Sequence, residues 1–178
     1  MENHLALRLK NVHYYIMDGS YSWAGELVIA NRFIYYFPVR DLMEERERTS
    51  AVGGLIGLLQ LKVIDFLGRN KSYLEEQNLI NSDADEETLQ PKLDRHLAEI
   101  KQEKNDQFFS YTNNSNRNKL PSPIRFEADD IQNIILDSKR LHFETVADKH
   151  DFKLAKSRTL EVHNALTKQG FVVSNKGK

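Results

Sequence analysis

The chain has 178 residues, a length that fits one domain or a small domain with an elaboration, since domains typically run to about 100–200 residues. It carries 25 Lys and Arg against 26 Asp and Glu, and this formal charge of −1 excludes a basic footprint for nucleic acid over the whole chain. The sequence contains no cysteine, which excludes disulfides, thiol nucleophiles and cysteine-ligated zinc.

No targeting signal is apparent in this sequence. Residues 1–9 lack the basic start and the continuous apolar stretch of a signal peptide. The most apolar run begins at residue 51, and polar residues from Gln60 onward interrupt it well before the roughly 20 residues that a bilayer crossing takes. We therefore expect a cytoplasmic protein, with peripheral association with a membrane left open.

The first 40 residues have the pattern of strands. Residues 5–16 alternate apolar and polar side chains with a change of phase before Val12, which predicts a bulged strand or two short strands. Residues 23–30 and 32–39 predict two further strands joined by a tight turn, with Pro38 marking the end of the second. An antiparallel meander is the simplest arrangement.

Residues 41–122 differ in kind. Apolar residues between 51 and 67 recur at the spacing of a helix face, and a second helical stripe comprises Leu89, Leu93, Leu97 and Ile100. Residues 112–119 contain no apolar side chain, which predicts a mobile loop. We expect 41–122 to be a helical, partly mobile insertion.

Strand patterns return in the last third of the chain. Residues 124–154 predict further strands, the last two joined at 147–150, and 155–169 predict a closing helix. Gly170 suits the position just after a helix end, and residues 172–178 are expected to form a tail.

Two hairpins resemble those of a known family. Residues 25–37 read GELVIANRFIYYF, two apolar strands around an Asn-Arg turn, and residues 141–154 form a hairpin that feeds the terminal helix. The layout resembles a pleckstrin-homology-like (PH-like) domain of the bacterial or GRAM type, over 3–40 plus 124–171. The resemblance implies an α+β fold, a bent antiparallel sheet or small barrel capped by the C-terminal helix, that serves as a lipid- or protein-binding module.

The apolar segment of the insertion is the first candidate for a functional surface. Gly53 and Gly57 lie four apart, so on a helix they form a groove that lets another backbone approach closely. We expect this helix to dock a protein partner, a second copy or a membrane surface, while a helix buried against its own sheet is the alternative. The candidate contact residues are Gly53, Leu55, Ile56, Gly57, Leu58 and Leu59.

A second candidate lies on the last hairpin. His142 and Glu144 are two apart and share one face of a strand, and His150 from the returning turn could join them on a metal ion. The competing interpretation is an ordinary polar outer face. The sequence has no nucleophile elbow, phosphate-binding loop or dinucleotide glycine pattern, so we expect no cofactor.

The function that these patterns favour is a non-enzymatic module that binds a protein partner, or itself, through the insertion. The alternatives are a peripheral membrane or lipid-binding PH-like domain, and a hydrolase or metal enzyme with a His/Glu site; the lack of a basic groove argues against nucleic acid. Residues 71–107 hold ten acids and five bases, a net charge of −5, and 149–178 hold seven bases and two acids, a net charge of +5. An acidic insertion and a basic terminal helix are expected to attract each other or a second copy.

Overall fold

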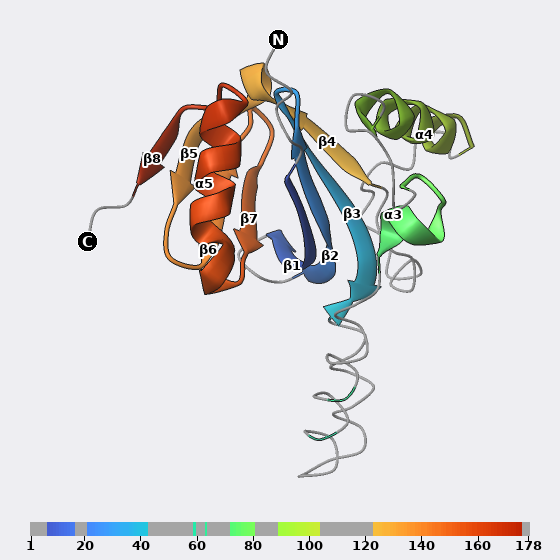
Figure 1. Cartoon of the computed structure of the whole chain (residues 1–178), viewed down its shortest axis with the longest axis horizontal. Helices are drawn as coiled ribbons and strands as arrows, with labels where there is room; N and C mark the ends of the chain where they lie inside the picture. Colours follow the sequence, from blue (N-terminus) through green and yellow to red (C-terminus); the bar gives the residue numbers. More distant parts are fainter. Residues whose placement is uncertain are drawn as a thin grey trace.

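The computed structural model describes residues 7–16, 21–42, 59, 63, 72–80, 89–103 and 123–175. The predicted loop at 112–119 and all of the predicted helix over 51–67 except residues 59 and 63 lie outside the described residues. The elements, in chain order (Figure 1), are β1 (Leu7–Ile16), β2 (Tyr21–Ala30), β3 (Phe33–Asp41), α3 (Tyr73–Glu76), α4 (Leu89–Glu103), β4 (Ile124–Glu127), a 3-10 turn (Ala128–Asp130), β5 (Gln132–Leu136), β6 (Arg140–Glu144), β7 (Lys149–Lys153), a 3-10 turn (Lys156–Arg158), α5 (Thr159–Lys168) and β8 (Val173–Asn175).

The strands form one sheet in the order β4-β3-β2-β1-β7-β6-β5-β8. Neighbouring strands are antiparallel except β5 and β8, which are parallel, so the sheet is mixed. The α+β class and the largely antiparallel sheet predicted from the sequence are confirmed. The sequence left a bent sheet and a small barrel open, and the structure has an open sheet with β4 and β8 at its edges.

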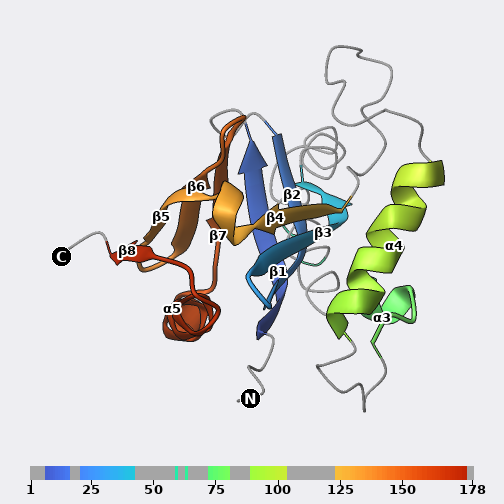
Figure 2. The ribbon, with the colours of Figure 1, turned by 90° about the horizontal axis from the view of Figure 1, so that it is seen from above.

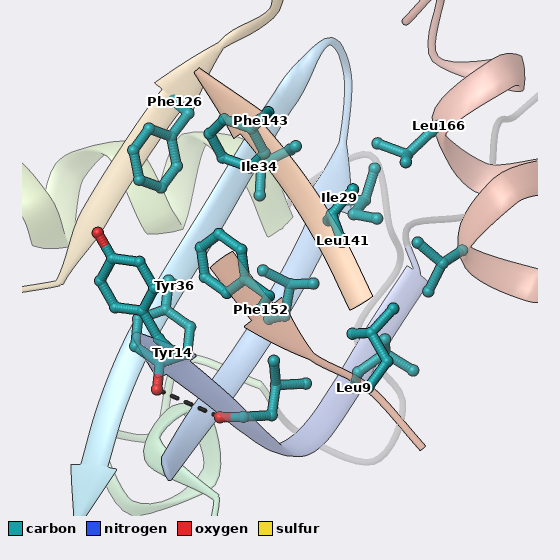
Figure 3. Packing of buried hydrophobic residues seen from close by; sticks show 14 of the residues in the cluster. Leu9, Tyr14, Ile29, Ile34, Tyr36, Phe126, Leu141, Phe143, Phe152 and Leu166 are labelled. Atoms are coloured by element: carbon teal, nitrogen blue, oxygen red, sulfur yellow. Dashed lines mark hydrogen bonds between the residues drawn. The ribbon is translucent and has the colours of Figure 1, made fainter. Parts of the chain in front are cut away.

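The sheet curls around its inner core (Figures 2 and 3). Phe126 of edge strand β4 packs edge-on against Phe143 of β6 and His150 of β7, with ring centroids 5.0 and 4.6 Å apart, although these strands are well separated in the sheet order. Helix α5 adds the fully buried Val162 and Leu166 to the same core. The helix therefore covers the inner side of the curl.

A bulge in β1 explains the change of phase in its sequence. The register of β1 against β2 shifts between Leu9 and Val12, and Asn11 between them has a left-handed backbone with a φ of 54°. Asn is one of the few residues that adopt this conformation readily. Leu9 and Val12 consequently both face the core, as the alternative of a bulged strand predicted.

The prediction that Pro38 ends its strand is wrong, because β3 continues to Asp41. Strand β4 pairs with β3 only as far as Tyr36, so β2 is the one neighbour of β3 at the proline among the described residues, and the register with β2 shifts beside Gly25. Edge positions and bulges are the settings in which sheets accept proline. A Cβ at Gly25 would lie 2.3 Å from the Phe37 carbonyl oxygen, so the close approach of β2 to β3 at this bulge requires glycine.

The C-terminal segment differs from the prediction at the start of its helix and again after its end. A 3-10 turn occupies 156–158, and α5 begins only at Thr159. Gly170 is left-handed at a φ of 82°, and the Phe171 N–H donates to the Leu166 carbonyl at 3.0 Å, as expected of a helix end. Where the sequence predicted a tail, β8 pairs in parallel with β5.

Candidate interaction surface

The insertion is anchored on the outer face of β2 and β3, opposite the inner core. Because side chains alternate along a strand, Leu27 and Ile29 face inward while Val28 and Ala30 face outward. The outer cluster comprises Val28, Ala30, Tyr35 and Phe37 of the sheet with Leu74 of α3 and Leu89, Leu93 and Leu97 of α4. The predicted helical stripe is thus confirmed, and its Leu residues are part of a second core. Figure 2 shows α4 on the side of the sheet away from α5.

A buried carboxylate joins α3 to the sheet. Glu26 of β2 is only 1% exposed, and it accepts hydrogen bonds from Arg8 Nε, from Ser72 Oγ at 3.0 Å and from the Leu74 N–H at 3.3 Å. Ser72 also caps α3 by accepting the Glu75 N–H at 3.1 Å. One side chain therefore positions the start of α3 against β1 and β2.

A second carboxylate of this network, Glu75 of α3, is half-exposed and pairs with Arg8 and Lys10 of β1. Glu75 accepts hydrogen bonds from Lys10 at 3.0 Å and from Arg8 at 2.9 Å, and these bonds lower the pKa of Glu75. Burial lowers the pKa of Arg8, but the carboxylates of Glu26 and Glu75 raise it by more. Both groups stay ionised at neutral pH.

Polar contacts also fix the position of α4. Tyr35 Oη donates to Asp94 at 3.1 Å, and Arg125 of β4 donates to the same carboxylate at 3.1 Å. Burial first, and then the charge of Asp94, raises the pKa of Tyr35, so its hydroxyl stays protonated. Tyr73 of α3 contacts His96 of α4 at 2.9 Å between Oη and Nε2. The two helices are thereby joined to each other and to the sheet.

The predicted contact residues are only partly described. Five of them lie outside the described residues: Gly53, Leu55, Ile56, Gly57 and Leu58. The sixth, Leu59, is helical and 54% exposed, and Val63, four residues later, is helical and 55% exposed. At these two positions the segment presents apolar side chains to solvent rather than to the sheet.

The structure does not bring the three metal candidates together. His150 pairs with Phe143 across β6 and β7, points into the inner core and is 7% exposed. His142 and Glu144 alternate with Phe143 and so lie on the opposite face of the sheet. Within the described ranges, no group of three or more His, Asp or Glu side chains is placed to hold a metal ion.

His150 has the surroundings of a neutral core residue. Its Nδ1 lies 2.7 Å from Tyr14 Oη and its Nε2 lies 3.3 Å from Thr145 Oγ1, contacts that a neutral ring satisfies by accepting at Nδ1 and donating at Nε2. Burial, opposed by the charge of Asp148 and helped by that of His142, lowers the pKa of His150 to about 4.

Sequence reasoning missed Glu26 as the residue that positions α3. Strands that are buried on both faces have nearly continuous apolar sequences. A charged residue at position 26, inside such an apolar stretch, was the signal that it has a specific partner. Its partner Ser72, however, lies 46 residues away along the chain, and no local pattern links the two.

Comparisons with known proteins assign no family to this architecture. Neither the protein-family models nor the curated proteins contain a match to the chain. In the part of the chain that the structure describes, no helix has the length and apolar composition that a membrane crossing requires.

Proposed function

We propose that the chain is a PH-like, non-enzymatic interaction module that binds a protein partner through its insertion. The order of its seven antiparallel strands and the helix that follows β7 into the core (Figure 1) support the PH-like assignment. The curl that brings Phe126 of β4 against Phe143 of β6 and His150 of β7 supports it too. The burial of His150 in the core argues against the alternative of a metal enzyme on the last hairpin.

The exposure of Leu59 and Val63 carries the proposal. Two large apolar side chains at i and i+4 lie on one side of a helix, and both are more than half exposed. Helices α3 and α4 fix other parts of the same insertion to the sheet through the outer cluster. Binding surfaces are commonly carried by such elaborations on a rigid scaffold.

A second copy of the chain is the partner that the charges favour. The acidic segment 71–107 contains α3 and α4, and the basic segment 149–178 contains α5. Helices α4 and α5 pack on opposite faces of the sheet (Figure 2), so attraction between them favours contact between two copies. Such a contact joins different surfaces of the two copies.

The oligomeric state of the full chain tests this proposal. We expect sedimentation velocity to show association that increases with protein concentration and weakens with added salt. Val63→Asp should reduce association by about tenfold or more, because an exposed apolar contact is replaced by a charge.

Val146→Asp is the matched control, since Val146 lies in the β6–β7 turn and is 89% exposed but is not part of the insertion. It should associate as the wild type does. A wild type that stays monomeric, or an equal effect of both substitutions, would contradict the proposal.

A further inference from the structure

Helix α4 packs on the outer face of β2 and β3 through a simple repeat. Its three buried leucines are four residues apart and therefore share one side of the helix: Leu89, Leu93 and Leu97. All three belong to the outer cluster, whereas Ala98, away from this stripe, is exposed. The outer face of β2 and β3 thus binds an amphipathic helix.

Polar contacts fix the position of the stripe along the sheet. Asp94, directly after the second leucine, accepts hydrogen bonds from Tyr35 Oη and from Arg125, both at 3.1 Å. In the first turn of α4, Gln90 accepts a hydrogen bond from Asn31 of the β2–β3 turn at 2.6 Å. Two donors that meet at Asp94, one of them charged, favour a carboxylate there. The contacts therefore define the helix that this face recognises, with leucines at i, i+4 and i+8 and an acid at i+5.

The hydrogen bonds that hold α4 on the sheet are made by side chains. Among the described residues, no backbone-to-backbone hydrogen bond links 89–103 to another element. Residues 81–88 and 104–122 connect α4 to α3 and β4, and at about 3.3 Å per residue they could span at most roughly 26 and 63 Å. Packed helices lie about 8–10 Å apart, so α4 can leave the sheet while α3 and β4 stay in place.

Helix α3 is attached to the sheet without the help of α4. Its Leu74 N–H donates to the buried carboxylate of Glu26 at 3.3 Å, and Ser72 Oγ donates to the same group at 3.0 Å. Helix α4 contacts α3 through His96 and β4 through Asp94. A helix in the position of α4 is therefore flanked by α3 and β4, which remain when α4 departs.

We propose that the outer face of β2 and β3 binds an amphipathic helix of a partner protein, and that α4 is the internal occupant which this partner helix displaces. The partner helix has the pattern of α4, with a leucine at every fourth position and an acid that pairs with Arg125 and Tyr35. The site uses other residues than Leu59 and Val63, so it goes beyond the proposed function. Because α4 is tethered beside the face that it covers, the partner competes with it, and binding tightens when α4 is weakened.

A labelled peptide with the sequence of residues 89–103 is the probe, and fluorescence anisotropy measures its binding to the full chain. Leu93→Ser in the full chain weakens the internal helix, so this variant should bind the unmodified peptide about tenfold or more tightly than the wild type does. Ala98→Ser is the matched control, since this exposed side chain belongs to the same helix but not to the stripe. It should bind the peptide as weakly as the wild type.

Asp94→Asn is a second variant, which leaves the leucine stripe intact. Loss of the charge that pairs with Arg125 should also tighten binding of the peptide, by a smaller factor than Leu93→Ser. Thermal unfolding verifies that each chain is folded, and Asp94→Asn decides the outcome if Leu93→Ser unfolds the chain.

Three results would overturn the proposal: no binding of the peptide to either variant, equal binding by both variants, Ala98→Ser and the wild type, or equally tight binding of a peptide that itself carries Leu93→Ser. The last would show that the peptide binds without recognition of its leucine stripe.

Discussion

The imidazole of His150 makes folding dependent on pH. Its pKa is about 4 in the folded chain against a usual value of 6.5, because burial disfavours the charged ring. The unfolded chain therefore takes up this proton first as the pH falls, and stability decreases from about pH 6.5 to about pH 4. The expected loss over this window is about 3 kcal/mol, measured by urea unfolding at a series of pH values.

His150→Phe keeps an aromatic ring in the cluster with Tyr14 and Phe126 but cannot titrate. Whatever its stability at neutral pH, this variant should show little of the wild-type decrease in free energy of unfolding between pH 6.5 and pH 4. His163→Gln on α5 is the control, since this side chain is only partly buried, and the slope should remain. A wild-type slope in His150→Phe would show that another group is responsible.

The attachment of α3 to the sheet depends on the buried carboxylate of Glu26. Glu26→Gln leaves an amide facing the Arg8 guanidinium, so a buried ion pair is lost while its geometry is kept. Breaking such a pair typically costs about 3–5 kcal/mol, and we expect an effect near the lower end because Arg8 is partly exposed. Chemical denaturation measures the difference in free energy of unfolding.

The same substitution at Glu75 is the matched control. Glu75 is a second, half-exposed partner of Arg8, and such surface pairs contribute about 0–1 kcal/mol. Glu75→Gln should therefore destabilise the chain by less than Glu26→Gln. Similar effects of the two substitutions would mean that burial of Glu26 is not what makes its ion pair important.

Local periodicity predicted most of the secondary structure. Alternation located the strands at both ends of the chain, the change of phase indicated the bulge at Asn11, and the stripe at 89–100 identified α4. Periodicity did not predict β8, because its three residues acquire strand character only by pairing with β5. Nor did it predict the continuation of β3 through Pro38, which depends on how far β4 extends.

The chemistry of the sites was less predictable than the elements that carry them. His142 and Glu144 share a face, as their spacing predicts, but His150 sits on a different strand, and the cross-strand register places it opposite Phe143. Such placements follow from the register of distant strands rather than from any local pattern.

At the scale of the whole molecule, the described residues form two cores on the two faces of one sheet, so the insertion contributes to stability. Val28, Tyr35 and Phe37 are fully buried on the outer face by α3 and α4.

Replacing residues 43–122 with a short Gly/Ser linker would expose these side chains, and each loses about 1.5–3 kcal/mol of favourable burial. We expect the shortened chain to bind a hydrophobic dye and to aggregate, because exposed apolar patches of this kind drive association. Adding Val28→Thr and Phe37→Thr to the shortened chain should reduce both effects, measured by dye fluorescence and light scattering. A shortened chain that is monomeric, folded and silent to the dye would show that the β-strands and α5 are stable without the second core.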